Sequence, residues 1–200
     1  MVIGDDFAWA HMPKTAGTAT VAMFGAFDGL VRFADSPDGV DAHLTFADRS
    51  EEIEGRLLVL NLRRLPAWAL SRARYVSIHG VYPDFEPIAM PSAEELAGSA
   101  FPDERLALFT GGGRLEIDRW LRAESLADDV LDFVASLREV TDAERARIQA
   151  VRRLNSVDYD HDVSNWFTPA QVELLYERNP AWAALEARVY GDAGVVAGRA

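Results

Sequence analysis

The residues with the clearest capacity for chemistry lie near the start of the chain, in the segment HMPKTAGT (11–18). A lysine, two threonines and a glycine stand here between the mostly apolar FAWA (Phe7–Ala10) and a stretch of small apolar residues. The order strand, glycine-containing loop, helix aims backbone N–H groups and a helix N-terminus at a phosphate or sulfate. The segment therefore predicts an anion-binding loop.

Two common nucleotide-binding motifs are absent from this loop. The nucleotide triphosphatase motif G-x-x-x-x-G-K-[ST] places its lysine after the glycines, whereas Lys14 precedes Gly17. The dinucleotide motif G-x-G-x-x-G is also missing. The run Gly111–Gly113 follows no convincing strand and is interpreted as a turn.

The elements that must position the loop are predicted from the hydrophobic pattern. Strands are expected at Phe7–Ala10 and at Arg56–Leu62, where RLLVLNL is a continuous apolar run typical of parallel strands buried on both faces. Each strand leads into an expected helix, one over Thr18–Phe27 and one that begins at Pro66. This arrangement indicates an α/β domain with a parallel sheet.

The rest of the chain is expected to be mainly helical. A long loop is predicted over residues 79–102, interrupted by a short helix start at Ser92–Leu96 with a capping-box pattern. From Arg114 onward, LEIDRWL, SLADDVLDFVASL and TDAERARIQAVRRL have helical spacing. A last helix is expected after the N-cap Thr168, with Pro169 at its first position.

Composition limits the class of protein. The 200 residues, of which 49% are hydrophobic, can bury one good core, so a single domain over residues 1–200 is expected. The chain has no apolar run of about eighteen residues, which argues against a membrane span. A net charge of −12 argues against a nucleic-acid partner. The lack of cysteine excludes disulfides and thiolate metal sites and fits a reducing cytoplasm.

The order H-x-P-K-T-x-G-T resembles the 5′-phosphosulfate-binding loop of sulfotransferases that use 3′-phosphoadenosine 5′-phosphosulfate (PAPS). It is most similar to the carbohydrate-type members, whose loop usually reads HIPKTGGT; Met12 and Ala16 replace the isoleucine and the first glycine. The resemblance implies a P-loop-like three-layer fold with a central parallel sheet flanked by helices and a helical C-terminal half. It also implies a transferase with PAPS as co-substrate, no metal, and a small-molecule or carbohydrate hydroxyl as acceptor, so the leading hypothesis is a cytoplasmic sulfotransferase.

The resemblance gives the loop residues their expected roles. Lys14, a compact cation with three donors, would stabilise charge that develops on the bridging oxygen. Backbone N–H groups of residues 15–19 and the hydroxyl of Thr18 would hold the non-bridging oxygens. The donor-binding residues expected here are Pro13, Lys14, Thr15, Ala16, Gly17, Thr18 and Ala19.

A second anion site is implied, because PAPS also carries a 3′-phosphate. In the family, an arginine at the end of a later strand and a serine eight residues on bind this phosphate, and Arg63 and Ser71 have that spacing. Family members usually have proline two residues after the arginine, but Pro66 stands two residues after Arg64. Both side chains must reach one phosphate, so the spacing favours Arg63. Arg64 is the alternative candidate for the phosphate. If neither arginine binds it, the two form a surface pair that caps the strand.

Weaker similarities to the family continue downstream. LRAESLADD (Leu121–Asp129) is similar to its R-x-E-x-L segment, and LNSVDYDHDVSNWFTPAQVELLYERN is similar to its C-terminal pattern. The resemblance thus extends over most of the chain, although only the two phosphate-binding segments are specific.

An acceptor hydroxyl needs a base, and His43 is the leading candidate. It lies between the two phosphate-binding segments and, with Phe46, forms a His-x-x-Phe setting that resembles the one around the catalytic histidine of some carbohydrate sulfotransferases. A carboxylate is the rival base, and the candidates are Asp41, Asp48 and the acidic residues between Asp84 and Glu95.

The other histidines and the tryptophans have less specific settings. His11 is interpreted as a structural member of the loop motif, His161 as part of the acidic stretch DYDHDV, and His79 as the entry to the long loop. Three tryptophans belong either to the core or to a platform for a sugar or aromatic ring, namely Trp68, Trp120 and Trp166.

Two other functions remain open from the sequence. A small-molecule kinase with a degenerate phosphate loop would need Mg²⁺-binding residues, but Arg63 and not an aspartate follows the second strand. A non-catalytic nucleotide-binding protein could keep the same fold. The chain is also short for a sulfotransferase, so a homodimer that completes the acceptor site is a further possibility.

Overall fold

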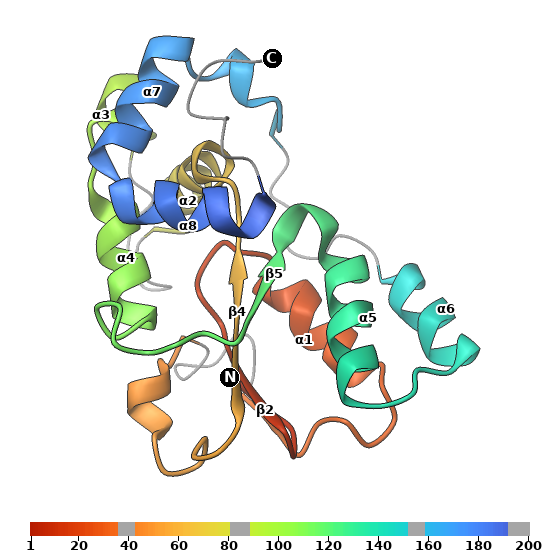
Figure 1. Cartoon of the computed structure of the whole chain (residues 1–200). Helices are drawn as coiled ribbons and strands as arrows, with labels where there is room; N and C mark the ends of the chain where they lie inside the picture. The colour runs from red at the N-terminus through yellow and green to blue at the C-terminus, as the bar shows by residue number, and fades with distance from the viewer. Residues whose placement is uncertain (36–42, 81–88, 152–158, 192–200) are drawn as a thin grey trace. The chain divides into compact units, whose positions relative to one another are not determined.

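The computed structural model describes residues 1–35, 43–80, 89–151 and 159–191 (Figure 1). In these ranges the chain is an α/β protein with a five-stranded mixed sheet. The strands are β1 (Val2–Ile3), β2 (Phe7–Ala10), β3 (Phe33–Ala34), β4 (Leu57–Leu62) and β5 (Arg119–Arg122). The α-helices are α1 (Gly17–Gly25), α2 (Leu65–His79), α3 (Ala93–Ala97), α4 (Phe101–Phe109), α5 (Leu126–Leu137), α6 (Asp142–Ala150), α7 (Pro169–Arg178) and α8 (Pro180–Tyr190), and the 3₁₀ helices are η1 (Phe46–Arg49), η2 (Ala123–Ser125) and η3 (Val163–Asn165). None of the helices in the described ranges is long and apolar enough to span a bilayer.

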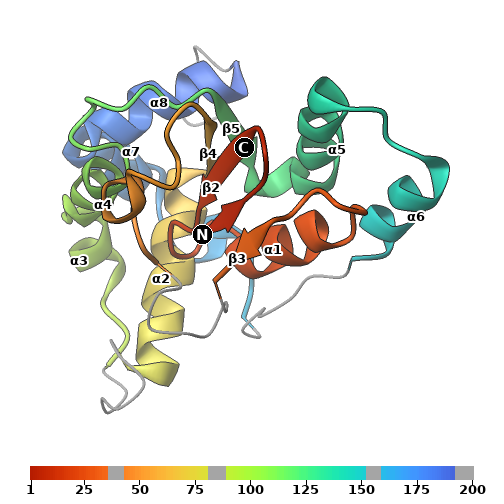
Figure 2. The ribbon, with the colours of Figure 1, turned by 90° about the horizontal axis from the view of Figure 1, so that it is seen from below.

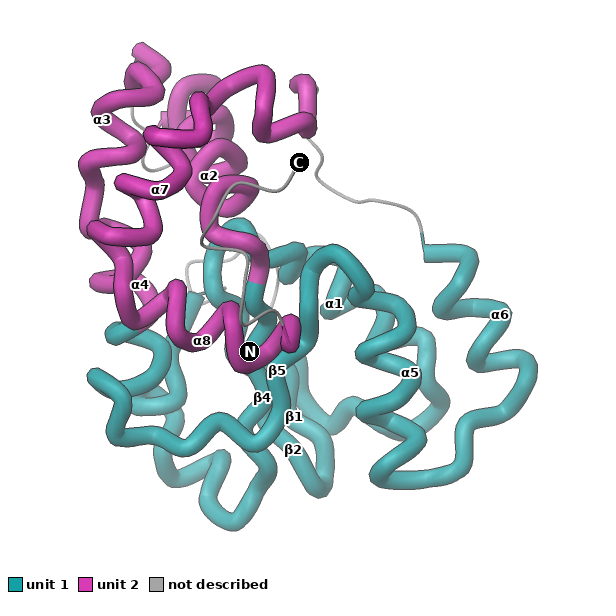
Figure 3. The backbone as a smooth tube through the Cα atoms, turned by 45° about the horizontal axis from the view of Figure 1, so that its top comes forward, with its two compact units in different colours: residues 1–62, 107–155 teal, residues 63–106, 156–200 magenta. Residues whose placement is uncertain are grey.

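The chain divides into two compact units, shown in teal and magenta in Figure 3. Unit 1 comprises Met1–Leu62 and Ala107–Asn155, and unit 2 comprises Arg63–Leu106 and Ser156–Ala200. The whole sheet, with α1, α5 and α6, belongs to unit 1, whereas α2, α3, α7 and α8 belong to unit 2. A single domain over residues 1–200 stays a prediction.

The sheet is mixed, whereas the sequence predicts a wholly parallel one. Its strand order is β3-β1-β2-β4-β5, and β2, β4 and β5 are parallel neighbours. The difference comes from β1, which is antiparallel to both β2 and β3. Strands of two residues, such as β1 and β3, are too short to show an alternation in sequence, so only their pairing partners reveal them.

The end of the segment LEIDRWL is a strand and not the helix that its spacing predicts. Arg119–Arg122 pairs in parallel with β4, with Leu62 opposite Arg122. Four residues hold too little periodicity to separate helix from strand, so the open edge of β4 decides the conformation. Just before it, Gly111–Gly113 forms the predicted turn, in which all three φ angles are positive.

Most of the other predicted elements are confirmed. The two predicted strands appear as β2 and β4, and the helices that follow them appear as α1 and α2. Ser92 caps α3 through the predicted capping box. Thr168 is the N-cap of α7, as predicted, and it also forms a capping box with Gln171. The sequence therefore located the strand, loop and helix that carry the candidate site.

Both views of the ribbon show α1 and α5 beside the sheet (Figures 1 and 2), and an aromatic cluster packs these helices against it. The ring centroid of Phe7 on β2 lies 5.0 Å from that of Phe24 on α1 and 5.3 Å from that of Phe133 on α5. All three side chains are buried, and burial of a side chain of this size contributes about 1.5–3 kcal/mol. The cluster fixes α1 against β2, and therefore both ends of the loop that joins them.

Candidate functional site

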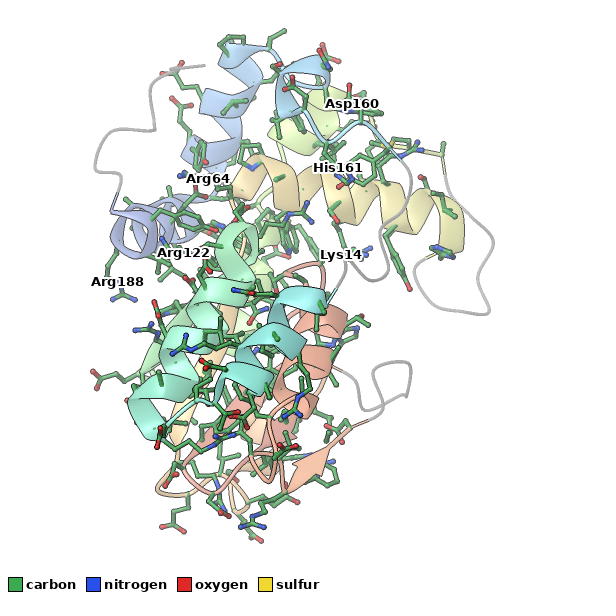
Figure 4. The ribbon with its side chains drawn as sticks, turned by 90° about the vertical axis from the view of Figure 1, so that its right-hand side faces the viewer. Lys14, Arg64, Arg122, Asp160, His161 and Arg188 are labelled. Carbon is green, nitrogen blue, oxygen red and sulfur yellow. The ribbon has the colours of Figure 1, made fainter. Side chains whose placement is uncertain are left out.

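The predicted anion loop connects β2 to α1, and Figure 4 labels its lysine, Lys14. Because β2 and β4 are parallel and Ala10 lies opposite Leu60, the carboxyl ends of both strands share one edge of the sheet. Open α/β sheets bind their ligands at such edges. Within the loop, Lys14 and Thr18 are half-buried, whereas Thr15 and Gly17 are buried.

The backbone of this loop has an unusual conformation. Lys14 and Ala16 have positive φ angles, of 66° and 70°, and they are the non-glycine residues with positive φ in the described ranges. The residues between and around them, Pro13, Thr15 and Gly17, do not share this conformation, so φ alternates in sign along the loop. In anion-binding nests, residues of alternating handedness turn successive N–H groups to one side. A left-handed conformation costs an L-residue about 1–2 kcal/mol, and such strain gathers at functional sites.

The Thr15 side chain is turned into the protein and not toward a ligand. Its hydroxyl donates to the carbonyl oxygen of Met12 at 2.7 Å, and the residue is fully buried. The part of Thr15 that remains for a ligand is its backbone N–H, which is the role that the resemblance implies. Ala16 occupies the N-cap position of α1 and provides no side-chain cap, and the first N–H groups of any α-helix point out of its N-terminus without an intrahelical acceptor.

His11 is a structural residue of the loop. Its ring stacks on Trp9, with centroids 5.5 Å apart, and is buried against the backbone of Gly17. Burial, followed by the charges of His43, the N-terminal amine and Lys14, lowers the pKa of His11 to about 3. The ring is therefore neutral at neutral pH and is a poor proton acceptor.

This contact explains why glycine stands at position 17. A Cβ atom built on Gly17 would overlap Cδ2 and Nε2 of His11. We expect Gly17→Ala to destabilise the protein by about 1–3 kcal/mol, because the buried ring must leave its place. Ala16→Gly is the matched control. It removes the strain of a positive φ at an L-residue, but it also removes a methyl group and raises the conformational entropy of the unfolded chain. These effects oppose each other, so the stability of this variant should stay within about 1 kcal/mol of the original. Urea unfolding measures both, and equal stability of Gly17→Ala and the parent would contradict this contact.

Asn61 is a site residue that the sequence analysis missed. It is fully buried on β4, and its side chain hydrogen-bonds Trp9 on β2, the carbonyl of Thr15 in the loop and the hydroxyl of Thr20 on α1. One amide thus ties the loop to the strands on which it rests. The signal was present in the sequence, since Asn61 is the polar residue within the otherwise apolar run LLVLNL.

The structure places His43 beside the loop, in contact with His11. Its Nδ1 lies 3.0 Å from the carbonyl oxygen of His11, and the two ring centroids are 4.5 Å apart. A carbonyl only accepts hydrogen bonds, so Nδ1 must carry the proton in this contact. In the neutral ring the lone pair is then on Nε2, and the side chain is exposed. This is the tautomer that can accept a proton from an incoming hydroxyl.

Two of the rival carboxylates that the structure describes, Asp48 and Glu95, have structural roles. Asp48 accepts from both the backbone N–H and the hydroxyl of Thr45, each at 2.7 Å, and these hydrogen bonds lower the pKa of its carboxyl. Glu95 completes the capping box of α3, and hydrogen bonds from Ser92 lower its pKa in the same way. Asp41 and Asp84 lie outside the described residues. Among the acidic candidates, Asp48 and Glu95 are thus weak bases.

Arg64 is engaged within unit 2. Its guanidinium forms an ion pair with the buried Glu186 at 3.2 Å and lies 4.4 Å from the ring centroid of Tyr190. Burial raises the pKa of Glu186, although its carboxylate also accepts from the backbone N–H of Leu65 and from the Tyr176 hydroxyl. This network joins the start of α2 to α8, which gives Arg64 a structural role.

Arg63 and Ser71 also belong to unit 2, whereas Lys14 and His43 belong to unit 1. Arg63 follows β4 directly, and its carbonyl accepts a hydrogen bond from Trp182 Nε1 at 3.1 Å. Ser71 is buried in the second turn of α2. The order strand, arginine, helix with serine is therefore the one that the resemblance requires.

The three candidate tryptophans differ in their surroundings. Trp68 is fully buried and packs on Trp182, with ring centroids 5.0 Å apart, so it belongs to the core of unit 2. Trp166 is half-buried, and the Arg74 guanidinium lies 5.9 Å from its ring centroid. Trp120 is half-buried on β5, and its buried Nε1 has no hydrogen-bond partner among the described residues.

The R-x-E-x-L segment contains an ion pair that joins β5 to α5. In the R-x-E-x-L segment, Arg122 forms a two-pronged ion pair with the buried Asp129; burial alone would raise the pKa of Asp129, but the hydrogen bonds from Arg122 lower it. Among the described residues, no group of three or more histidine and acidic side chains is placed to hold a metal ion.

No family model, no curated protein and no solved structure matches this chain.

Proposed function

We propose that this protein is a sulfotransferase that moves a sulfuryl group from PAPS to a hydroxyl of a small-molecule or carbohydrate acceptor. The observation that carries the proposal is the loop backbone, in which φ alternates in sign through Lys14 and Ala16 at the carboxyl edge of parallel strands. A concave array of N–H groups at that edge suits a phosphosulfate. The proposal includes a P-loop-like three-layer arrangement of the fold.

The use of lysine in the chain supports this role. Lysine and arginine total 20, and Lys14 is the one lysine in the sequence, so 20 − 1 = 19 of the basic residues are arginines. A compact ammonium group follows charge on a single oxygen better than the broad guanidinium fork does. A chain that otherwise uses arginine throughout therefore has its lysine at the position where a point charge is needed.

The expected chemistry is an in-line transfer between two oxygens. The acceptor oxygen forms a bond to sulfur while the bond from sulfur to the bridging oxygen of PAPS breaks. The acceptor proton passes to Nε2 of His43, and the electron pair of the broken bond stays on the bridging oxygen beside Lys14. The products are the sulfated acceptor and adenosine 3′,5′-bisphosphate.

Ligand-induced thermal stabilisation tests this function directly. Adenosine 3′,5′-bisphosphate without metal should raise the melting temperature, because a ligand that binds only the folded state stabilises it. ATP with Mg²⁺ should have no comparable effect. Stabilisation by ATP with Mg²⁺ alone would point to a kinase, and no effect of either ligand would point to a non-catalytic protein.

The single lysine allows an independent readout of where the bisphosphate binds. An amine-reactive acetylating reagent has one lysine side chain to modify in this sequence, Lys14, whereas the N-terminal amine is buried in an ion pair with Asp35 at 2.7 Å. The bisphosphate should slow acetylation of the peptide that contains Lys14. Equal rates with and without the ligand would place the nucleotide elsewhere.

Arg63 and Arg64 should differ in their effect on binding. We expect Arg63→Ala to weaken bisphosphate binding by about 1.5–3 kcal/mol, the contribution of one charge-assisted hydrogen bond to the 3′-phosphate. Arg64→Ala removes the partner of the buried Glu186 and should lower stability with a smaller effect on affinity. Calorimetric titration and thermal unfolding separate the two effects. A loss of affinity in Arg64→Ala alone would show that the spacing argument chose the wrong arginine.

A further inference from the structure

We propose that Asn61 is a positioning residue that orients the anion-binding N–H groups of the loop; this inference rests on the function proposed above. Asn61 does not face a ligand itself, since it is fully buried on β4. Its effect on an anion must therefore pass through the backbone that it holds.

The orientation of the Asn61 amide follows from its partners. Indole Nε1 of Trp9 can only donate, so the group that it meets at 2.8 Å must be the amide oxygen Oδ1. The amide nitrogen Nδ2 then faces the loop. It donates to the carbonyl oxygen of Thr15 at 2.7 Å and to the hydroxyl of Thr20 at 2.6 Å. Trp9 thus decides which end of the amide meets the loop.

The bond from Asn61 to the Thr15 carbonyl sets the direction of the next N–H group. In a trans peptide the C=O and N–H bonds point in opposite directions. With the Thr15 carbonyl drawn toward β4, the N–H of Ala16 must point away from that strand. Ala16 is one of the two non-glycine residues with positive φ in the described ranges, and we assign its N–H to the proposed anion-binding nest.

The bond from Asn61 to Thr20 extends this control to a second peptide. Because the Thr20 hydroxyl accepts from Asn61, its own proton is directed to the carbonyl oxygen of Ala16, at 3.1 Å. The backbone N–H of Thr20 donates to the same carbonyl oxygen, also at 3.1 Å. The Ala16 carbonyl is therefore held toward the helix, and the N–H of Gly17 points out of the helix N-terminus. One buried amide orients two consecutive N–H donors.

The role of Asn61 is tested by measuring how much the 5′-phosphate adds to the affinity of the nucleotide. Adenosine 3′,5′-bisphosphate and adenosine 3′-monophosphate differ by that phosphate alone, so the ratio of their affinities reports on the loop. We expect Asn61→Leu, which keeps the approximate side-chain volume and removes the amide, to lower this ratio about 10-fold or more. Asn61→Ser, whose side chain is one heavy atom shorter, should lower it as well and serves if the leucine variant does not fold.

A matched control comes from Asn179, the fully buried asparagine of unit 2. Its amide nitrogen donates to the carbonyl oxygens of Ser99 and Leu175, each at 2.8 Å, and its amide oxygen accepts from the backbone N–H of Asp103. Asn179→Leu should lower thermal stability to an extent similar to that in Asn61→Leu, yet leave the affinity ratio unchanged. The control therefore separates a loss of stability from a loss of loop geometry.

Each outcome of the titrations is decisive. A ratio that falls in the Asn61 variants and not in Asn179→Leu supports the positioning role. An unchanged ratio in a folded Asn61 variant overturns that role and leaves the proposed sulfotransferase function standing. If the original protein binds the bisphosphate no more tightly than the monophosphate, the proposed function fails, and the inference about Asn61 fails with it.

Discussion

Replacing His43 by alanine should lower turnover about 10²–10⁴-fold while binding of adenosine 3′,5′-bisphosphate changes little. An acceptor hydroxyl has a pKa far above neutrality, so it needs a base at the moment of transfer. The contact of His43 Nδ1 with the His11 carbonyl leaves the lone pair of the neutral ring on Nε2. A base of this kind must be neutral before each turnover.

The dependence of turnover on pH should identify the base. With His43 intact, turnover should rise with pH through an apparent pKa in the ordinary histidine range, about 6.5. In His43→Ala this acid limb should disappear. A carboxylate base has an ordinary pKa of about 4, so turnover would no longer change with pH at about pH 6.

His161 is a suitable histidine control because it is exposed and its ring contacts that of Tyr159. His161→Ala should keep both the rate and the acid limb. A His43→Ala variant with near-normal turnover and an intact acid limb would rule out His43, and the search for a base would move to Asp41 and the acidic residues of segment 84–95.

Replacing Lys14 by alanine should lower turnover about 10²–10³-fold with a much smaller change in donor affinity. The reason is that a charge aimed at the bridging oxygen gains most of its interaction as that oxygen becomes negative. The fold should be unaffected, because Lys14 is half-buried in a loop and alanine bears the same strain at a φ of 66°.

Two control variants make the Lys14 result specific. Arg145 is an exposed cation on α6 of the same unit, and Arg145→Ala removes one positive charge without touching the loop. This variant should keep its turnover. Lys14→Arg retains the charge but spreads it over a planar group, so we expect only partial activity. Unchanged turnover in Lys14→Ala would remove Lys14 from the mechanism.

The sequence by itself determined the local arrangement of the candidate site. The apolar runs FAWA and LLVLNL are β2 and β4, and the loop and the arginine that follow them stand at strand ends as predicted. These features are local, because burial on both faces gives a continuous apolar run and capping residues act within one helical turn. The expected roles of Lys14, Arg63 and Ser71 come from spacing and stay predictions.

Only the tertiary structure decided which residues support the site and how the sheet is completed. Strand β5 and the antiparallel β1 follow from pairing with neighbours, since segments of two to four residues carry no period of their own. Asn61, 46 residues from Thr15 in the chain, meets the loop only because β4 lies beside β2. Arg64 meets Glu186, which is 122 residues away. Such contacts depend on where distant segments pack, and a local pattern contains no information about that.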